Sequence, residues 1–186
     1  LDYFETAEVN AREGSSGEQV VLDVDVEEKP TGSLNFGGSF SNNDGLGIAI
    51  SFAEENFLGR GQKLRLSVST ASEATRYGID FVEPRLLGRD LALGLQLDYA
   101  ESDSSFASYD VNRFVFQPSL TFPVSENGRL QLRYAYQDAE MTDRDDPAAA
   151  PPVQTNGGIV QSEIARGSEV ASAIGYTYSY DTRLGG

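Results

Sequence analysis

Clustered carboxylates are the side chains in this chain that could most readily support chemistry. Asp80 and Glu83 are spaced as a general acid and base could be, and Asp143, Asp145 and Asp146 form a second acidic group. The chain has no histidine and no cysteine, which removes the usual general base, the commonest metal ligand and any thiolate. Because the sequence shows no base, nucleophile or pocket beside either group, we interpret both as surface and loop charges and expect no enzyme activity.

Two further segments resemble ligand-binding loops in composition alone. Asn42-Asn43-Asp44-Gly45 and Asp143-Arg144-Asp145-Asp146 are rich in possible calcium ligands, but they lack the spacing and the glutamate of an EF-hand loop. Gly59 and Gly61 are typical of a turn and not of a phosphate-binding loop. The sequence therefore predicts no metal ion and no cofactor.

Composition narrows the class of protein. The length of 186 residues corresponds to one domain, or to one domain and a fragment, and the net charge of -15 argues against a nucleic-acid partner. The sequence contains no run of about 18 apolar residues, so it has no candidate membrane helix. A membrane β-barrel remains compatible with this composition, because a barrel wall needs an apolar residue only at every second position. Leu1 is not an initiator methionine and no signal peptide is recognisable, so we expect the sequence to begin inside a longer or processed chain.

A period of two is the main pattern of the chain from Ser33 onward. Between Leu91 and Tyr99, every odd-numbered residue is apolar and every even-numbered residue is small or polar, as in a strand with two unlike faces. The same alternation predicts eight strands, within residues 33–40, 46–52, 63–69, 76–82, 91–99, 109–122, 129–136 and 170–181.

The connections between these segments alternate in length. Those at 56–62, 83–90 and 123–129 are short, whereas those at 70–75, 101–108 and 137–169 are polar and more variable. Short turns at one end and longer loops at the other are typical of bacterial outer-membrane barrels. We predict a surface loop at Gln137–Glu169, in which Ile159 and Ile164 could support a short helix.

Two fold classes fit the alternation: a transmembrane antiparallel β-barrel and a soluble β-sandwich. The polar face could line a wet lumen or form the outer surface of a sandwich, so it does not separate them. Aromatic residues near the strand ends favour the barrel, because such residues form girdles at the membrane interface: Tyr77, Tyr99, Phe122 and Tyr180.

The first 29 residues form a different unit. Residues 3–9 and 19–28 predict two strands around a turn at 12–17, with apolar and acidic residues alternating in the second strand. Two strands are marginally stable alone, so this hairpin is expected to belong to a domain that begins further upstream. Pro30-Thr31-Gly32 would act as a hinge before the barrel unit at 33–186.

Several segments resemble the BamA family, the outer-membrane β-barrel assembly factors. The resemblance is carried by Leu1–Val9, Val20–Gly38, the turns Glu54–Gly61 and Phe81–Gly88, and Tyr176–Arg183. It implies an all-β chain: residues 1–29 would be the last strands of a periplasmic POTRA domain, followed by the first eight of sixteen barrel strands in the bacterial outer membrane. Eight strands that close on themselves are the alternative, but they would crowd many charged side chains inside a narrow barrel.

The resemblance also implies a function, a site and a set of partners. Members of the family insert client barrels at a lateral gate, where the first barrel strand pairs with a client strand by β-augmentation. Carried over to this chain, the gate comprises Thr31, Gly32, Ser33, Leu34, Asn35, Phe36, Gly37, Gly38, Ser39 and Phe40. Periplasmic partners would dock at Val20, Leu22, Asp23, Val24, Asp25 and Val26. The expected partners are assembly-machine lipoproteins, nascent outer-membrane β-barrel proteins, outer-membrane lipid and the remaining half of the barrel, with no nucleic acid.

The residues offer a physical basis for such a gate. Gly32, Gly37 and Gly38 weaken a strand and provide no side chain to fix its register, and Pro30 lacks an amide donor. The same glycines could instead only relieve crowding at a barrel wall. Three other functions stay open: a paralogous translocation and assembly barrel, a passive small barrel or porin, and a soluble β-sandwich adhesin or binding module.

Overall fold

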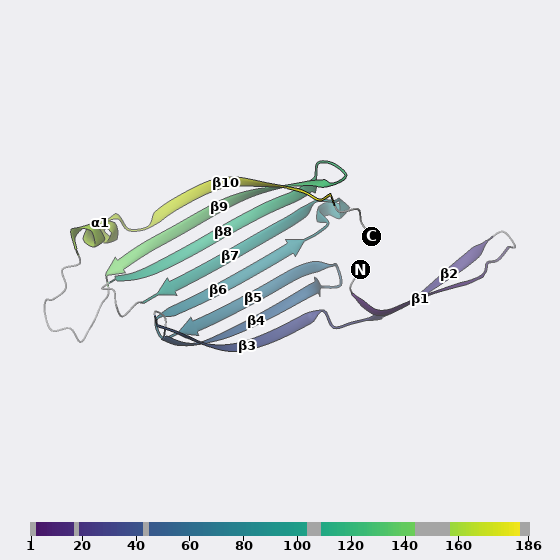
Figure 1. Cartoon of the computed structure of the whole chain (residues 1–186), viewed down its shortest axis with the longest axis horizontal. Helices are drawn as coiled ribbons and strands as arrows, with labels where there is room; N and C mark the ends of the chain where they lie inside the picture. Colours follow the sequence, from purple (N-terminus) through teal and green to yellow (C-terminus); the bar gives the residue numbers. More distant parts are fainter. Residues whose placement is uncertain (1–2, 17–18, 43–44, 104–108, 144–156, 183–186) are drawn as a thin grey trace. The chain divides into compact units, whose positions relative to one another are not determined.

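The computed structural model describes residues 3–16, 19–42, 45–103, 109–143 and 157–182. The chain divides into two compact units, Leu1–Gly32 and Ser33–Gly186. Strands dominate both units (Figure 1). In the described ranges, no helix has the length and apolar character required to cross a bilayer.

The first unit is a single antiparallel hairpin of β1 (Phe4–Glu13) and β2 (Val20–Glu28). The register places Val9 opposite Val24, so the apolar residues of both strands share one face. The irregularity between Phe4 and Thr6 shifts the pairing by one residue near the start of β1. The hairpin agrees with the predicted strands, and its assignment to a POTRA domain stays a prediction.

The second unit contains one eight-stranded sheet whose strands follow chain order (Figure 1). The sheet is open, with β3 and β10 as its edges. All pairings described between neighbouring strands are antiparallel. The strands are β3 (Gly32–Ser41), β4 (Gly45–Phe57), β5 (Gln62–Ala71), β6 (Ala74–Glu83), β7 (Ala92–Ser102), β8 (Tyr109–Pro123), β9 (Gly128–Asp143) and β10 (Glu169–Tyr180).

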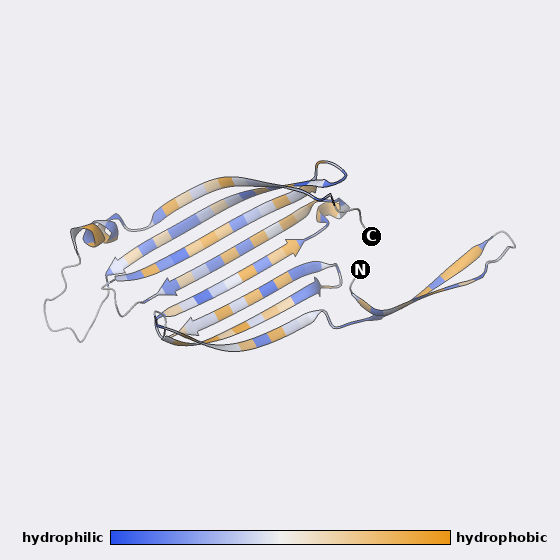
Figure 2. Cartoon of the chain, in the orientation of Figure 1, coloured by the Kyte–Doolittle hydropathy of each residue, from blue (hydrophilic) through white to orange (hydrophobic). Residues whose placement is uncertain are grey.

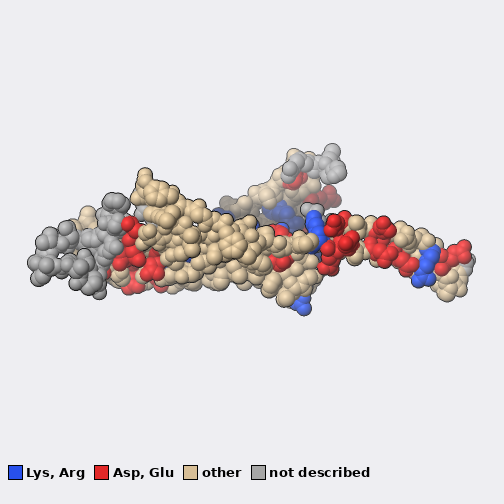
Figure 3. Space-filling model, turned by 90° about the horizontal axis from the view of Figure 1, so that it is seen from below, with Lys and Arg blue, Asp and Glu red and all other residues tan. Residues whose placement is uncertain are grey.

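The strand register collects the apolar side chains on one face of this sheet. Across three strands, Leu66 lies opposite Ile79 and Ile79 lies opposite Leu97. The residues between them alternate to the other face, where Arg65 lies opposite Asp80. Figure 2 shows the resulting alternation of hydrophobic and hydrophilic residues along each strand, and Figure 3 shows a face with few charges over its middle.

Among the described residues, no protein layer packs on the apolar face. Ala74, at 5% exposure, is the one buried hydrophobic residue among those described, and Ile79 in the middle of the sheet is 43% exposed. A β-sandwich would bury this face against a second sheet. The described chain is therefore a single-layer sheet, and the sandwich interpretation is wrong.

The end of β9 differs from the sequence-based expectation. β9 continues to Asp143, so residues 137–143 belong to a strand and not to the predicted loop. They are mostly polar, but they pair along their whole length with the start of β8, from Tyr109 opposite Asp143 onward. The predicted short helix is confirmed as α1 (Gly158–Arg166), and a short 3-10 turn, η1 (Leu86–Gly88), lies between β6 and β7.

Candidate functional site

β3 is the edge strand that contains nearly all of the predicted gate. Residues 32–40 are all exposed, and Thr31 is half-buried just before the strand begins. Phe36 is 71% exposed, compared with 43% for Ile79 in the middle of the same sheet. The difference arises because a side chain in an edge strand has a neighbouring strand on one side only.

The glycines of β3 lie in open space. No described heavy atom would come within 4 Å of a β-carbon added at Gly37, and one added at Gly38 would meet only the carbonyl oxygen of Gly47, at 3.9 Å. The packing of the described residues therefore does not require glycine at either position. The crowding that could have explained these two glycines is not present around them in this part of the protein.

Glycines in the neighbouring strands lie in a different environment. A β-carbon at Gly47 in β4 would lie 2.9 Å from Cβ of Ala71 and 3.0 Å from the carbonyl oxygen of Thr70. One at Gly78 in β6 would lie 2.6 Å from Oγ of Ser67. The hydroxyl of Ser67 can rotate away, whereas Cβ of Ala71 and the carbonyl of Thr70 cannot, so close approach requires glycine at position 47 and not at the β3 edge.

The other edge, β10, is held by side chains of its neighbour. Arg133 of β9 lies across Gly175, where an added β-carbon would be 2.8 Å from Nε, and its Nη1 donates a hydrogen bond of 2.7 Å to Oγ1 of Thr177. A second hydrogen bond of 2.9 Å joins the hydroxyls of Tyr134 and Ser172. These contacts fix β10 to the sheet through side chains as well as through the backbone.

The residues predicted for periplasmic docking lie on β2 and divide between its faces. The four apolar members are all exposed and share a face: Val20, Leu22, Val24 and Val26. On the other face, Nε of Arg12 forms an ion pair of 2.6 Å with Asp23, and Asp25 lies opposite Glu8. The hairpin therefore offers one apolar and one acidic surface.

Asp80 and Glu83, the first pair of carboxylates that suggested catalysis, lie on opposite faces of the sheet. Asp80 lies on the polar face, whereas Glu83 follows Phe81 on the apolar side and pairs with Leu93. The carboxylate of Glu83 accepts hydrogen bonds from Nε2 of Gln62 at 2.6 Å and from the amide of Arg85 at 2.9 Å, so it organises a turn.

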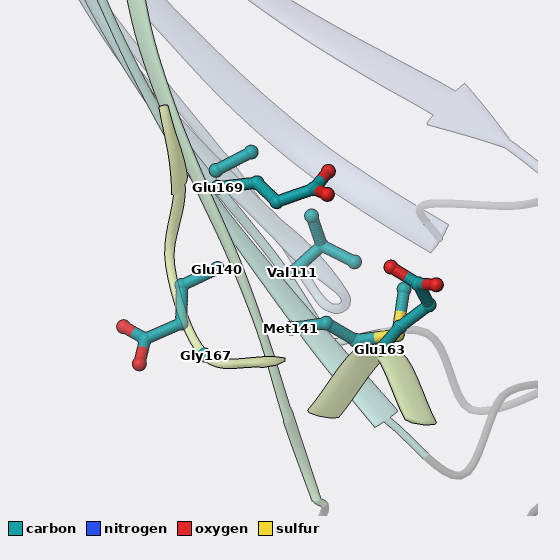
Figure 4. Close-up of a pocket in the computed structure, with 7 residues that line it drawn as sticks. Val111, Glu140, Met141, Glu163, Gly167 and Glu169 are labelled. Carbon is teal, nitrogen blue, oxygen red and sulfur yellow. The ribbon is translucent and has the colours of Figure 1, made fainter. Parts of the chain in front are cut away.

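The two calcium-like segments are only partly described. Residues 43–44 and 144–156 lie outside the described residues, and with them half of the first segment and three of the four residues of the second. The described part of the chain contains no group of three or more Asp or Glu side chains arranged to hold a metal ion. A small hollow of about 100 Å³ lies beside α1. Figure 4 shows its lining, which includes Val111, Met141 and acidic side chains. Two of these carboxylates, Glu163 and Glu169, are paired with Arg166 at 2.9 and 3.6 Å.

Two short turns share a geometry that the sequence-based reasoning did not identify. Leu58 and Leu87 have φ angles of 56° and 55°, and each is followed by a glycine that also has a positive φ. In both turns the glycine amide donates to a carbonyl three residues earlier at 2.9 Å, from Gly59 to Asn56 and from Gly88 to Arg85. The signal in the sequence is a repeated Glu-x-x-(Phe/Leu)-Leu-Gly-Arg at 54–60 and 83–89.

An open antiparallel sheet with one continuous exposed apolar face defines a class of protein. Such a sheet forms the wall of a membrane-spanning barrel, in which lipid covers the apolar face. The comparison with protein families gives the family: residues 56–183 match the Omp85 superfamily domain, and the chain belongs to this superfamily.

Individual relatives agree with this assignment. The chain is 23% identical over 173 residues to the outer membrane protein assembly factor BamA of Neorickettsia risticii, covering 91% of this chain and 23% of that protein. It is 32% identical over 106 residues to a putative outer membrane protein assembly factor of Treponema pallidum, covering 53% of this chain and 12% of that protein. The chain thus spans a quarter or less of the length of these relatives.

A solved structure shows the same fold. The crystal structure of BamA from Haemophilus ducreyi lacking POTRA domains 1–3 superposes with a TM-score of 0.63 at 22% identity, over 99% of this chain and 36% of that one. The match confirms the predicted all-β antiparallel fold.

Proposed function

We propose that this chain is part of an insertase of the bacterial outer membrane, which assembles client β-barrel proteins at the edge of β3. The observation that carries the proposal is the open β3 edge, whose glycines no described contact requires. An exposed strand edge presents amide and carbonyl groups to which an incoming strand can pair. The names of the relatives, outer membrane protein assembly factors, support this function over a passive pore.

The proposal assigns a role to each unit. Residues 1–29 supply the last strands of a periplasmic POTRA domain, 30–32 are a hinge, and the sheet from Ser33 onward is the first half of a sixteen-stranded barrel. The β2 residues from Val20 to Val26 contact assembly-machine lipoproteins or nascent clients. Recognition runs through the backbone, so the machine needs neither catalysis nor a cofactor and can accept clients of many sequences.

The experiment replaces Gly37 and Gly38 with Val in the full-length protein. Both positions have room for the new side chains and neither has a positive φ, so the variant is expected to fold. The added branched side chains stiffen the edge and restrict its register. Insertion of a radiolabelled client barrel into proteoliposomes, followed by protease protection, should slow several-fold.

Gly157→Val is the matched control. It adds the same side chain at a position with no described heavy atom within 4 Å, directly before α1 and outside β3. Client insertion by this control should equal that of the wild type. If the Gly37→Val/Gly38→Val variant also inserts clients at the wild-type rate, β3 is not the pairing edge.

A further inference from the structure

Leu58 and Leu87 are exposed apolar side chains in an unfavourable backbone conformation. They are 72% and 86% exposed, and both occupy the left-handed region. Asn, Asp or Gly adopt this conformation with less strain and dominate such turns. Neither leucine gains burial within the described chain in return. We call Leu58 and Leu87 the tips of their turns. Leucine at both tips indicates that an environment outside the chain accepts an apolar side chain.

The two turns hold their leucines in the same way. The carboxylates of Glu54 and Glu83 each accept a 2.9 Å hydrogen bond from the amide two residues later. The amides of Arg60 and Arg89 donate to the carbonyls of Phe57 and Leu86, at 3.3 and 3.2 Å, and close each turn around its leucine. The tips are thus preorganised and not loosely extended.

One arginine lies beside the first tip and two beside the second, while the nearby acids are largely engaged. Arg60 follows the first tip, and Arg85 and Arg89 flank the second. Glu55 is paired with Lys63 at 2.6 Å, and Asp90 with Arg129 at 2.7 Å. Within the described residues, the guanidinium groups of Arg85 and Arg89 form no ion pair. The second tip in particular combines an apolar side chain with positive charge.

Both turns lie at the same end of the sheet. They connect β4 to β5 and β6 to β7, and alternate connections of an antiparallel meander share an end, as Figure 1 shows. The turns directly continue strands whose apolar face is exposed. The tips are therefore positioned at the boundary of that face.

We propose that the Leu58 and Leu87 turns form a membrane-interface anchor, in which the leucines insert between phospholipid headgroups and the arginines bind their phosphates. Apolar side chains beside arginines are the combination that binds this interface, since the arginine stem lies along apolar surface and its guanidinium pairs with phosphate. The inference rests on the proposed function only in requiring that the sheet spans the membrane. The anchor would fix the height of the sheet in the bilayer next to the β3 edge.

A genetically encoded benzophenone in the full-length protein tests this anchor. The protein is reconstituted into vesicles of phosphatidylethanolamine and radiolabelled phosphatidylglycerol, and lipid adducts are counted after irradiation. Positions 58 and 87 carry the probe, position 79 on the apolar face is the positive control, and position 159 is the matched control. Ile159 is an equally exposed aliphatic residue, at 80%, but lies on α1.

The expected result is lipid adducts at 58, 87 and 79, several-fold above those at 159. Adducts at 79 with only background at 58 and 87, or protein adducts alone at the tips, would overturn the anchor and leave the proposed function standing. Lipid adducts at background level at position 79 would mean that the sheet does not span the membrane, and both proposals would fail.

Variants separate an anchor from a purely structural role. Leu58→Asn and Leu87→Asn relieve the left-handed strain, so thermal stability in detergent should stay the same or rise. A loss of stability would mean that the leucines pack within the protein, which contradicts the anchor. Arg85→Gln with Arg89→Gln should lower the adduct yield at position 87 and leave the yield at 58 unchanged. An unchanged adduct yield at position 87 would mean that these arginines do not bind the lipid phosphates.

Discussion

Glycine serves opposite purposes in two adjacent strands of this sheet. Gly47 in β4 lies against Ala71 so closely that no larger residue fits without movement, whereas Gly37 in β3 faces open space. Both are glycines in strands with ordinary extended φ values. Packing explains Gly47. It does not explain Gly37, and we attribute that glycine to the function of the strand edge. The difference teaches that glycine content alone does not identify a weak strand, because the surroundings of each glycine decide what it does.

The largest expected effect comes from a charge placed on the apolar face in the middle of the sheet. Ile79→Arg should destabilise the protein in lipid by about 2–4 kcal/mol, as arginine does at the midplane of a membrane barrel. Urea titration of the full-length protein in vesicles measures the change. Gln117→Arg in β8 is the control: Gln117 lies opposite Gln96 on the polar face, and its replacement should cost far less. Equal losses would mean that the two faces do not differ in environment.

A smaller loss is expected where glycine is required by contact. Gly47→Val would press against Cβ of Ala71 and the carbonyl oxygen of Thr70, atoms that cannot rotate away. Overpacking of this kind costs about 1–3 kcal/mol. The same titration measures it, with Gly38→Val in the neighbouring strand as the comparison. If both variants lose equal stability, the contrast between the two strands does not hold in the assembled protein.

The sequence was sufficient for the strands and their faces, because a period of two with apolar residues on one side specifies both. It was insufficient at the loop end of β9, where the strand extends beyond the apolar band. Apart from Ala139 and Met141, residues 137–143 are polar, and their pairing with β8 identifies them as strand. Asp80 and Glu83 are only three residues apart in the sequence, yet the alternation of side chains along the strand places them on opposite faces.

The candidate site shows a similar limit. The family resemblance pointed to residues 31–40 and their glycines offered a physical reason, but a sequence cannot separate Gly37 from Gly47, since the distinction lies in contacts with other strands. The sequence predicted turns around Leu58 and Leu87, and their repeated seven residues could have shown that the two turns share a geometry. Their left-handed backbone could not have been predicted, because leucine is an unusual residue for that conformation.

The smallest expected effect is that of Gly37→Val on folding. Valine suits an extended backbone and restricts the unfolded chain more than glycine does, and no described atom obstructs it. The free energy of unfolding should therefore change by less than about 1 kcal/mol, with a gain as plausible as a loss. Urea titration of the variant alongside Gly47→Val measures the contrast directly. A loss comparable to that of Gly47→Val would mean that β3 is tightly packed in the complete barrel, and its glycines would then be explained by crowding. A stable variant that inserts clients slowly would instead separate the two roles of the strand: its contribution to the wall is unaffected, and its freedom to pair is what the glycines preserve.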